Sequence, residues 1–257
     1  MGLPFTFLNP LFSGVFNGSG NSKVPFIANS AGLIINIVLD PILIYGYFGL
    51  PKYGVSGAAI ATTLSQMIVT IIFIVFSFFD GKIVKGFNLV KNFSKAIFKE
   101  VIRLGVPTAF KSCIFAFIST ILLRIIANWG ENAVAAENVA VQIEAINWMT
   151  VEGFSIALCA LIAQNYGAKN FENIQSGYKK GLKIILWIGV FCSVFLFVSS
   201  DFIIRLFIKD DLETIRMGVS YLKVLAFSEI FLALEIGLSG MFNGLKNTKT
   251  PTIISTF

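Results

Sequence analysis

The chain has 257 residues, of which 56% are hydrophobic and only 13% are charged, and its mean hydropathy is +0.81. A water-soluble domain needs far more charge to cover its surface, so this composition favours a protein of the lipid bilayer over a soluble enzyme or binding module. The net charge of +6 does not indicate a nucleic-acid partner, because the basic residues lie in short loops between apolar stretches.

Several of the apolar stretches are long enough to span a membrane. A helix needs roughly 20 apolar residues to cross a hydrocarbon core about 30 Å thick. In chain order, the apolar stretches predict the end of a helix over 1–16, helices over 25–45, 55–79, 107–129, 133–163, 181–199 and 217–242, and the first turns of another over 251–257. The sequence therefore predicts an all-α, polytopic membrane protein.

Few residue types are available for chemistry in these helices. The chain has no histidine, and its three cysteines lie inside apolar stretches without the spacing of a metal or redox site. The sequence also lacks a nucleophile–base arrangement, so it predicts neither an enzyme nor a bound cofactor. Proton or cation chemistry is left to carboxylates, amides, hydroxyls and backbone carbonyls.

Residues 80–106 differ from the predicted spans because they are amphipathic. Basic residues recur every four positions on one side, and apolar residues recur at helical spacing on another: Lys91, Lys95, Lys99 and Arg103 against Val90, Phe93, Ile97, Val101 and Leu104. Such a helix either lies on an anionic membrane surface or is a solvated linker. Both interpretations place it in the cytoplasm.

The loops also predict the orientation of the chain. With residues 80–106 inside the cell, the inner loops carry thirteen lysines and arginines, against four in the outer loops. Positive charge in short loops marks the cytoplasmic side. We therefore expect a multi-pass protein of the plasma membrane whose 80–106 linker lies in the cytoplasm.

One loop motif occurs twice in the chain. Residues 13–25 align without gaps on residues 239–251, and eight of the thirteen positions are identical. Each copy ends an apolar helix with glycine and asparagine and opens the next with proline. Generic turn chemistry does not explain why serine, phenylalanine and lysine also match, so the motif indicates an internal duplication.

The two copies are separated by six predicted spans, an even number, so the repeats have the same orientation. Parallel repeats related by an axis along the membrane normal are a transporter architecture. We therefore expect a helical bundle of two parallel six-helix lobes, each incomplete in this sequence. Residues 1–79 are predicted to be the C-terminal half of the N-lobe, 80–106 a linker, and 107–257 the N-terminal part of the C-lobe.

Three further runs of residues resemble a known family. Residues 36–46 are Asn-Ile-Val-Leu-Asp-Pro-Ile-Leu-Ile-Tyr-Gly, residues 57–62 are Gly-Ala-Ala-Ile-Ala-Thr, and residues 164–168 are Gln-Asn-Tyr-Gly-Ala. With the repeated loop, they resemble the multidrug and toxic compound extrusion (MATE) transporters over essentially the whole chain. The resemblance implies twelve helices, of which about the fourth to the tenth are present, and export of cationic or other amphipathic compounds in exchange for Na⁺ or H⁺.

Asn36 and Asp40 are the sharpest candidates for a cation site. Their spacing places them on one face of a helix, and Asp40 lies deep in an apolar span, where a carboxylate is costly and usually functional. Pro41 has no backbone N–H, so it frees the carbonyl of Ile37 and predicts a kink. These oxygens suit a hard cation such as Na⁺, and a desolvated carboxylate suits proton exchange. The alternative is that Asp40 only braces the proline kink.

The resemblance adds Thr62, since a threonine on the sixth helix of the family contributes to an N-lobe cation site beside the matching asparagine and aspartate. An aspartate on the first helix of the family completes that site, and that helix is absent from this sequence. Some members instead carry a coupling glutamate on the seventh helix, where residues 110–115 of this chain have no acid. This difference favours the N-lobe scheme and leaves the choice between H⁺ and Na⁺ open.

Acidic residues of the second half are candidates to line a cavity. Glu137 and Glu144 are two turns apart on one face of 133–163, and Glu152 lies somewhat off that face. Lys111 is expected to pair with one of these three acids, either as a structural ion pair or as part of the cavity. Carboxylates in a cavity would attract cationic compounds.

Glu229 and Glu235, in the helix predicted over 217–242, are weaker candidates. They point in different directions around the helix, and one of them is expected to face the outer interface. A stripe of small residues, Gly57, Ala61 and Ser65, predicts close helix packing.

These features favour a secondary active antiporter that exports drugs or other amphipathic or cationic compounds by alternating access, in exchange for H⁺ or Na⁺. The expected partners are the lipid bilayer and a small-molecule substrate, and we expect the full-length protein to be monomeric. Two alternatives remain. One is a flippase for a lipid-linked oligosaccharide, against which acidic cavity residues argue, and the other is a non-transporting fragment.

Overall fold

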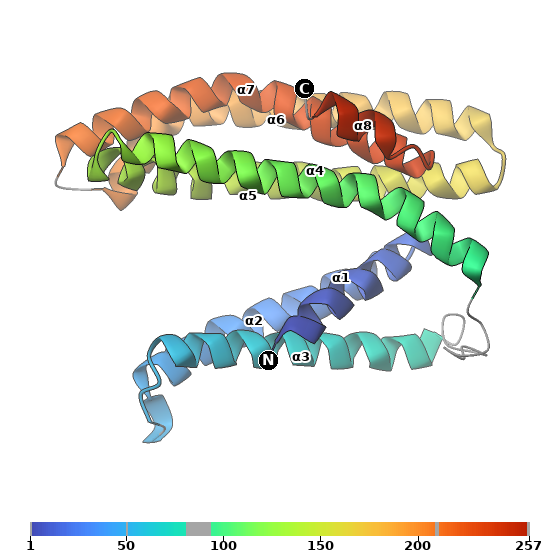
Figure 1. The fold of residues 1–257 in the computed structure, drawn as a ribbon, viewed down its shortest axis with the longest axis horizontal. Coiled ribbons are helices and arrows are strands. Elements are labelled where there is room, and N and C mark those ends of the chain that lie inside the picture. Colours follow the sequence, from blue (N-terminus) through green and yellow to red (C-terminus); the bar gives the residue numbers. More distant parts are fainter. Residues whose placement is uncertain (1, 50, 81–93, 209–210, 256–257) are drawn as a thin grey trace. The chain divides into compact units, whose positions relative to one another are not determined.

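The structure, a computed structural model, describes residues 2–49, 51–80, 94–208 and 211–255, and within them it is helical throughout apart from the turns (Figure 1). The elements are α1 (Leu3–Gly18), α2 (Lys23–Tyr45), the short 3-10 helix η1 (Tyr47–Gly49), α3 (Val55–Asp80), α4 (Lys95–Ala127), α5 (Glu131–Gly167), α6 (Phe171–Phe207), α7 (Leu212–Gly244) and α8 (Lys249–Ile254). Among the described helices, six are long and apolar enough to cross a membrane, namely α2 to α7. The predicted all-α membrane fold is confirmed.

The long helices extend beyond the predicted spans. The spans 133–163, 181–199 and 217–242 correspond to α5, α6 and α7, each of which continues at both ends. The apolar pattern stops where a helix leaves the hydrocarbon layer, whereas the backbone hydrogen bonds continue into polar sequence. For example, α6 includes Lys179, Lys180 and Lys183.

The described part of the predicted amphipathic segment is not a separate helix. Residues 95–106 are the first turns of α4, which continues past Pro107 to Ala127. Proline within a helix removes one backbone hydrogen bond without necessarily ending the helix, and membrane helices tolerate this. The beginning of the segment, with Lys91, lies outside the described residues.

The chain forms two compact units, Met1–Ser94 and Lys95–Phe257. In the first unit, α2 and α3 are packed against each other and α1 contacts both. Phe16 of α1 and Phe73 of α3 are fully buried in its core, with their rings stacked at 5.9 Å. The small-residue stripe of α3 is confirmed: a Cβ at Gly57 would lie 2.5 Å from the carbonyl oxygen of Leu43, and Ala61 is fully buried.

A buried polar cluster joins α1 to α3. The Asn9 side-chain amide donates to the side-chain oxygen of Gln66 at 2.6 Å, and the Thr70 hydroxyl donates to the Asn9 oxygen at 2.7 Å. Asn9 is 4% exposed, so each of its polar atoms is buried and has a partner. Satisfied polar groups of this kind hold helices together where no hydrophobic difference separates protein from lipid.

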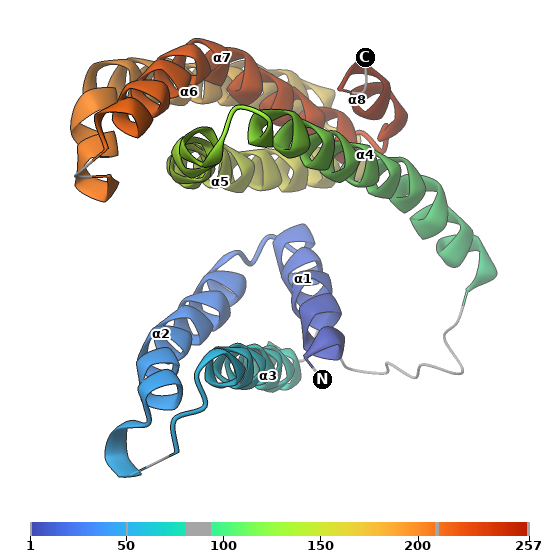
Figure 2. The same cartoon turned by 60° about the vertical axis from the view of Figure 1, so that its left-hand side comes forward.

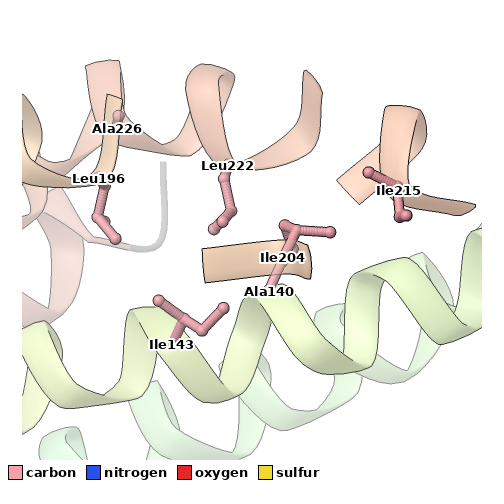
Figure 3. Packing of buried hydrophobic residues seen from close by; sticks show 7 residues of the cluster. All are labelled: Ala140, Ile143, Leu196, Ile204, Ile215, Leu222 and Ala226. Carbon is pink, nitrogen blue, oxygen red and sulfur yellow. The ribbon is translucent and has the colours of Figure 1, made fainter. Parts of the chain in front are cut away.

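In the second unit, α5, α6 and α7 pack side by side, and α4 and α8 lie on the outside of this group (Figures 1 and 2). Figure 3 shows one of its two apolar clusters, formed by Ala140, Ile143, Leu196, Ile204, Ile215, Leu222 and Ala226 from these three helices. No residue of α4 is buried. Its apolar surface suits contact with lipid or with other helices.

The contact between α5 and α7 is especially close at Gly240. A Cβ there would lie 2.6 Å from the backbone oxygen of Ser155, and the Ser155 hydroxyl donates to the carbonyl oxygen of Ile236 at 2.8 Å. Small residues allow two membrane helices to approach to backbone contact. The two helices are therefore held in one register.

The repeated loop has the same backbone in both copies. Gly20 and Lys246 occupy equivalent positions with φ of 85° and 60°, the left-handed conformation that commonly ends a helix. The following asparagine donates its backbone N–H to a phenylalanine carbonyl at 3.0 Å in each copy, Asn21 to Phe16 and Asn247 to Phe242. The next helices begin at Lys23 and Lys249. The sequence repeat is thus also a structural repeat.

Candidate functional site

The structure brings Asn36 and Asp40 together on α2. The Asn36 side-chain amide donates to a carboxylate oxygen of Asp40 at 3.4 Å, and both side chains are partly buried. α2 continues through Pro41 as one helix to Tyr45. The long donor–acceptor distance means a weak hydrogen bond, so the oxygens of Asp40 remain available to another partner.

Thr62 lies on the neighbouring helix at the level of this pair. Gly57 of α3 meets Leu43 of α2, and Gly32 of α2 meets Val69 of α3, so the two helices run antiparallel with Thr62 between these contacts. The Thr62 hydroxyl donates to the carbonyl oxygen of Ala58 in its own helix at 3.0 Å. The participation of Thr62 in a shared cation site stays a prediction.

A cavity of about 700 Å³ lies within the second unit, between α4, α5, α7 and the start of α8. Its charged lining residues are Lys111, Glu144, Glu152 and Glu235. Phe115 and Trp148 add aromatic surface, and hydroxyl and amide groups such as those of Ser239 and Asn243 complete the wall. A cavity of this size and mixed lining is typical of a small-molecule site.

Lys111 forms an ion pair with Glu235, its ammonium nitrogen 2.6 Å from a carboxylate oxygen. The expected pairing of Lys111 with Glu137, Glu144 or Glu152 is therefore wrong. The reason is the orientation of α7 about its own axis, which turns Glu235 into the cavity. Sequence periodicity does not determine this orientation. Glu235 also accepts a hydrogen bond from the Ser239 hydroxyl at 3.2 Å.

Glu137 lies apart from the other cavity candidates. Its separation of seven positions from Glu144 corresponds to about 10 Å along a helix axis. Glu137 is near Tyr221 of α7 and does not line the cavity as the described residues form it. A shared helix face is therefore not sufficient to place two side chains in one cavity.

Glu229 of α7 is fully buried, and sequence reasoning missed its environment. Its carboxyl group accepts a hydrogen bond from the side-chain amide of Asn147 on α5, which is 5% exposed. The expectation that one of Glu229 and Glu235 faces the outer interface is wrong, because Glu229 faces the helix core and Glu235 faces the cavity. The signal that could have identified Glu229 is its place at the centre of an apolar span, where an acid is usually functional.

Comparison with known families agrees with this architecture. The sequence profile of the MatE family matches residues 107–257, which is more than half of the chain. The chain belongs to the MatE family. A second profile, that of the lipid II flippase MurJ, matches residues 1–85.

Relatives of this MatE chain are described as multidrug resistance proteins. A probable multidrug resistance protein NorM of Thermotoga maritima is 28% identical over 247 residues, covering 95% of this chain and 52% of the relative. The probable multidrug resistance protein YoeA of Bacillus subtilis is 27% identical over 258 residues, covering 99% of this chain and 56% of the relative. The MatE chain thus spans about half the length of the curated relatives that it matches.

Solved structures of the family share the fold. An outward-facing multidrug resistance transporter of the MATE family superposes with a TM-score of 0.89 at 25% identity, covering 100% of this chain and 56% of that one. A transporter of the MOP superfamily from Pyrococcus furiosus, described as having a binding pocket of reverse polarity, gives the same TM-score at 25% identity and 57% coverage of its own chain. These similarities place the MatE chain in a family of transporters rather than enzymes.

Proposed function

We propose that this chain is part of a cation-coupled exporter of amphipathic organic cations. The observation that carries the proposal is the acidic cavity of the second unit, in which three carboxylates face a single ammonium group. Because Lys111 and Glu235 neutralise each other, Glu144 and Glu152 remain to attract a positively charged substrate. The family relationship supplies the transport activity, and the cavity supplies the substrate class.

Aromatic groups complete the chemistry that such a substrate needs. Phe115 of α4 and Trp148 of α5 line the same cavity as the carboxylates. An aromatic face attracts a cation and also covers apolar surface, so it suits a ligand that is both positively charged and lipophilic. A small hydrophilic cation would gain only the first of these interactions.

The first unit supplies the coupling site of the proposed exporter. Asn36 and Asp40 form the described pair, Pro41 frees the carbonyl oxygen of Ile37, and Thr62 lies at the same level of α3. Carboxylate, amide and hydroxyl oxygens suit Na⁺, and the Asp40 carboxylate also suits a proton. H⁺ or Na⁺ moving down its gradient would thus be exchanged for the exported cation, while the two lobes open the binding site alternately to each side of the membrane.

This proposal includes the location and assembly predicted from the sequence. The protein would act in the plasma membrane, with residues 80–106 in the cytoplasm, and as a monomer. The basic residues Lys95, Lys99 and Arg103 on the first turns of α4 support the cytoplasmic location.

The test is efflux of tetraphenylphosphonium, a lipophilic organic cation, from vesicles with separately imposed Na⁺ and pH gradients. The assay uses the protein at the full length that its gene encodes. We expect one gradient to drive efflux and the Asp40→Asn variant to lose the gradient-driven component while its expression is unchanged. Efflux by Asp40→Asn at the wild-type rate would remove Asp40 from the coupling site.

A matched control is Asp201→Asn at the end of α6. The Asp201 carboxylate is exposed and pairs with Arg205 one turn away at 2.8 Å, so its replacement changes the same chemical group outside both sites. Efflux by this variant is expected to match the wild type. A loss as large as that of Asp40→Asn would show that the assay reports general damage.

A second candidate function is the flipping of a lipid-linked sugar, which the MurJ profile match over residues 1–85 favours. The head of such a lipid carries negatively charged phosphates, which Glu144 and Glu152 would repel. Adding a polyprenyl diphosphate to the efflux assay separates the two functions. We expect no inhibition, whereas inhibition at concentrations below those of the organic cation would favour the flippase.

A further inference from the structure

The Asn147–Glu229 pair contains two buried atoms that lack a hydrogen-bond partner. One carboxyl oxygen of Glu229, Oε2, accepts from the Asn147 amide Nδ2. The other carboxyl oxygen, Oε1, and the Asn147 carbonyl oxygen Oδ1 have no partner, and they are the two buried side-chain atoms without one in the described part of the chain. Buried polar atoms are nearly always hydrogen-bonded, so this exception needs a cause.

Both unpartnered atoms are acceptors, and one proton satisfies both. A proton on Glu229 Oε1 turns that oxygen into a donor toward Asn147 Oδ1. Since each of these atoms shares a carbon with an atom of the existing hydrogen bond, a second hydrogen bond between them would close a ring between a carboxylic acid and an amide. All four polar atoms are then paired.

The surroundings of the pair favour a neutral acid. Within the described chain, the charged group that acts on Glu229 is Glu144 of α5, which has the same sign. On the side of α6, the thiol of Cys192 interacts electrostatically with Glu229, and Gly189 packs closely against Ala233 of α7. A carboxylate held here without a cation would be costly.

A metal ion does not fit the pair as well as a proton does. Hard cations are typically held by about six oxygen ligands. The pair offers one free carboxyl oxygen and one amide oxygen, both buried. A proton needs only the two atoms that are present.

We propose that Glu229 is a proton-carrying group, held as a neutral acid by Asn147 and released when a cation neutralises Glu144. This rests on the proposed export function, which it extends by naming the proton as an exchanged ion. Glu144 lines the cavity and lies one turn from Asn147 on α5. A positive substrate beside Glu144 would remove the repulsion that keeps negative charge from Glu229, and the Glu229 proton would then pass to solvent as the substrate enters.

The experiment measures the proton directly. Infrared difference spectra of the purified protein are compared for wild type, Glu229→Gln and Glu213→Gln. Glu229→Gln can form both hydrogen bonds of the proposed ring with Asn147 but carries no titratable proton, and Glu213 is an exposed acid on the same helix. We expect a carbonyl band of a protonated carboxyl group at neutral pH that disappears in Glu229→Gln and persists in Glu213→Gln. Identical spectra of the wild type and Glu229→Gln would overturn the proposal.

A second measurement tests the exchange. Tetraphenylphosphonium is added to the purified protein in weakly buffered detergent solution, and bound cation and released protons are both counted. We expect proton release in proportion to binding for wild type and Glu213→Gln, and loss of that release with retained binding for Glu229→Gln. Binding without proton release in the wild type would overturn the exchange and leave the export function standing. Absence of binding would instead contradict the proposed substrate class, and the infrared band would still decide the protonation of Glu229.

Discussion

The two units of the protein each contain an amide–carboxyl pair, and the pairs differ in almost every physical respect. Asn36 and Asp40 lie one turn apart on a single helix, partly buried and joined by a long hydrogen bond of 3.4 Å. Asn147 and Glu229 lie on different helices and are buried in the core of their unit. The same two functional groups thus occur once in an open setting and once in a closed one.

The difference shows how burial selects the ion that a carboxyl group can hold. Asp40 keeps oxygens that a hydrated cation can approach, which suits the exchange of Na⁺ or H⁺ proposed for it. Glu229 is fully buried and has one carboxyl oxygen without a partner beside Asn147, which suits a proton. The comparison therefore predicts that substitutions in the closed pair reduce stability as well as proton release, whereas substitutions in the open pair affect coupling with little loss of stability.

The substitution with the greatest expected cost is at Gly240, where α5 and α7, the two helices that carry the closed pair, are in close contact. Gly240→Ala places a Cβ 2.6 Å from the backbone oxygen of Ser155, so α5 and α7 must move apart. We expect a loss of about 3 kcal/mol, at the upper end of overpacking costs. The measurement is unfolding in detergent micelles.

The control for this substitution comes from the repeated loop. Gly14 is the equivalent residue of the first copy, and a Cβ there meets nothing within 4 Å. Gly14→Ala is expected to be neutral or to stabilise α1 by up to about 1 kcal/mol. Equal losses for the two variants would show that the α5–α7 contact has no special role.

The next effect compares the two amides. Asn147→Leu removes the hydrogen-bond partner of a fully buried carboxyl group, which costs about 2 kcal/mol. Asn36→Leu removes a weak, partly exposed bond and is expected to cost under about 1 kcal/mol. Unfolding of both variants at one pH measures the difference, and a larger loss for Asn36→Leu would reverse the comparison.

A smaller effect is the dependence of stability on pH. A folded protein that holds a proton on Glu229 releases it on unfolding once the pH exceeds the value at which an unfolded glutamate ionises. Stability then falls as pH rises, by at most about 1.4 kcal/mol per pH unit for one proton, until Glu229 ionises in the folded state. Glu229→Gln should lack this component, while Asp40→Asn should retain it. Parallel pH profiles of wild type and Glu229→Gln would contradict a protonated Glu229.

The smallest effect concerns the cavity ion pair. Lys111→Met leaves Glu235 without its cation and gives the cavity a third free carboxylate. The pair is about one-third exposed, and such pairs contribute about 1 kcal/mol or less. We expect binding of an organic cation to strengthen by no more than about fivefold. Weaker binding would show that Lys111 itself supports the substrate.

Much of the fold follows from local sequence, and so does the open pair. The spans, the repeat and the Asn36–Asp40 contact each depend on residues within one helix or one loop, where spacing determines geometry. The closed pair was beyond such reasoning. Asn147 and Glu229 are 82 residues apart, and their contact depends on the rotation of α7 against α5.

The same limit explains the error over Lys111. Its partner, Glu235, lies 124 positions later in the chain on α7, whereas the spacing visible in the sequence relates only the acids of α5 to one another. Packing at Gly240 fixes the register of α7 and thereby turns Glu235 toward the cavity. That register depends on atomic contacts, which periodicity does not contain.

The acidic cavity of the second unit is proposed to hold organic cations. Its most direct test is the equilibrium affinity for tetraphenylphosphonium of the wild type and of the Glu144→Gln/Glu152→Gln double variant, in the same detergent and at the same ionic strength. Each carboxylate is expected to contribute on the order of 1 kcal/mol, so the double variant should bind about tenfold or more weakly. An unchanged affinity would contradict the proposed substrate site, because the cavity carboxylates would then not bind the cation.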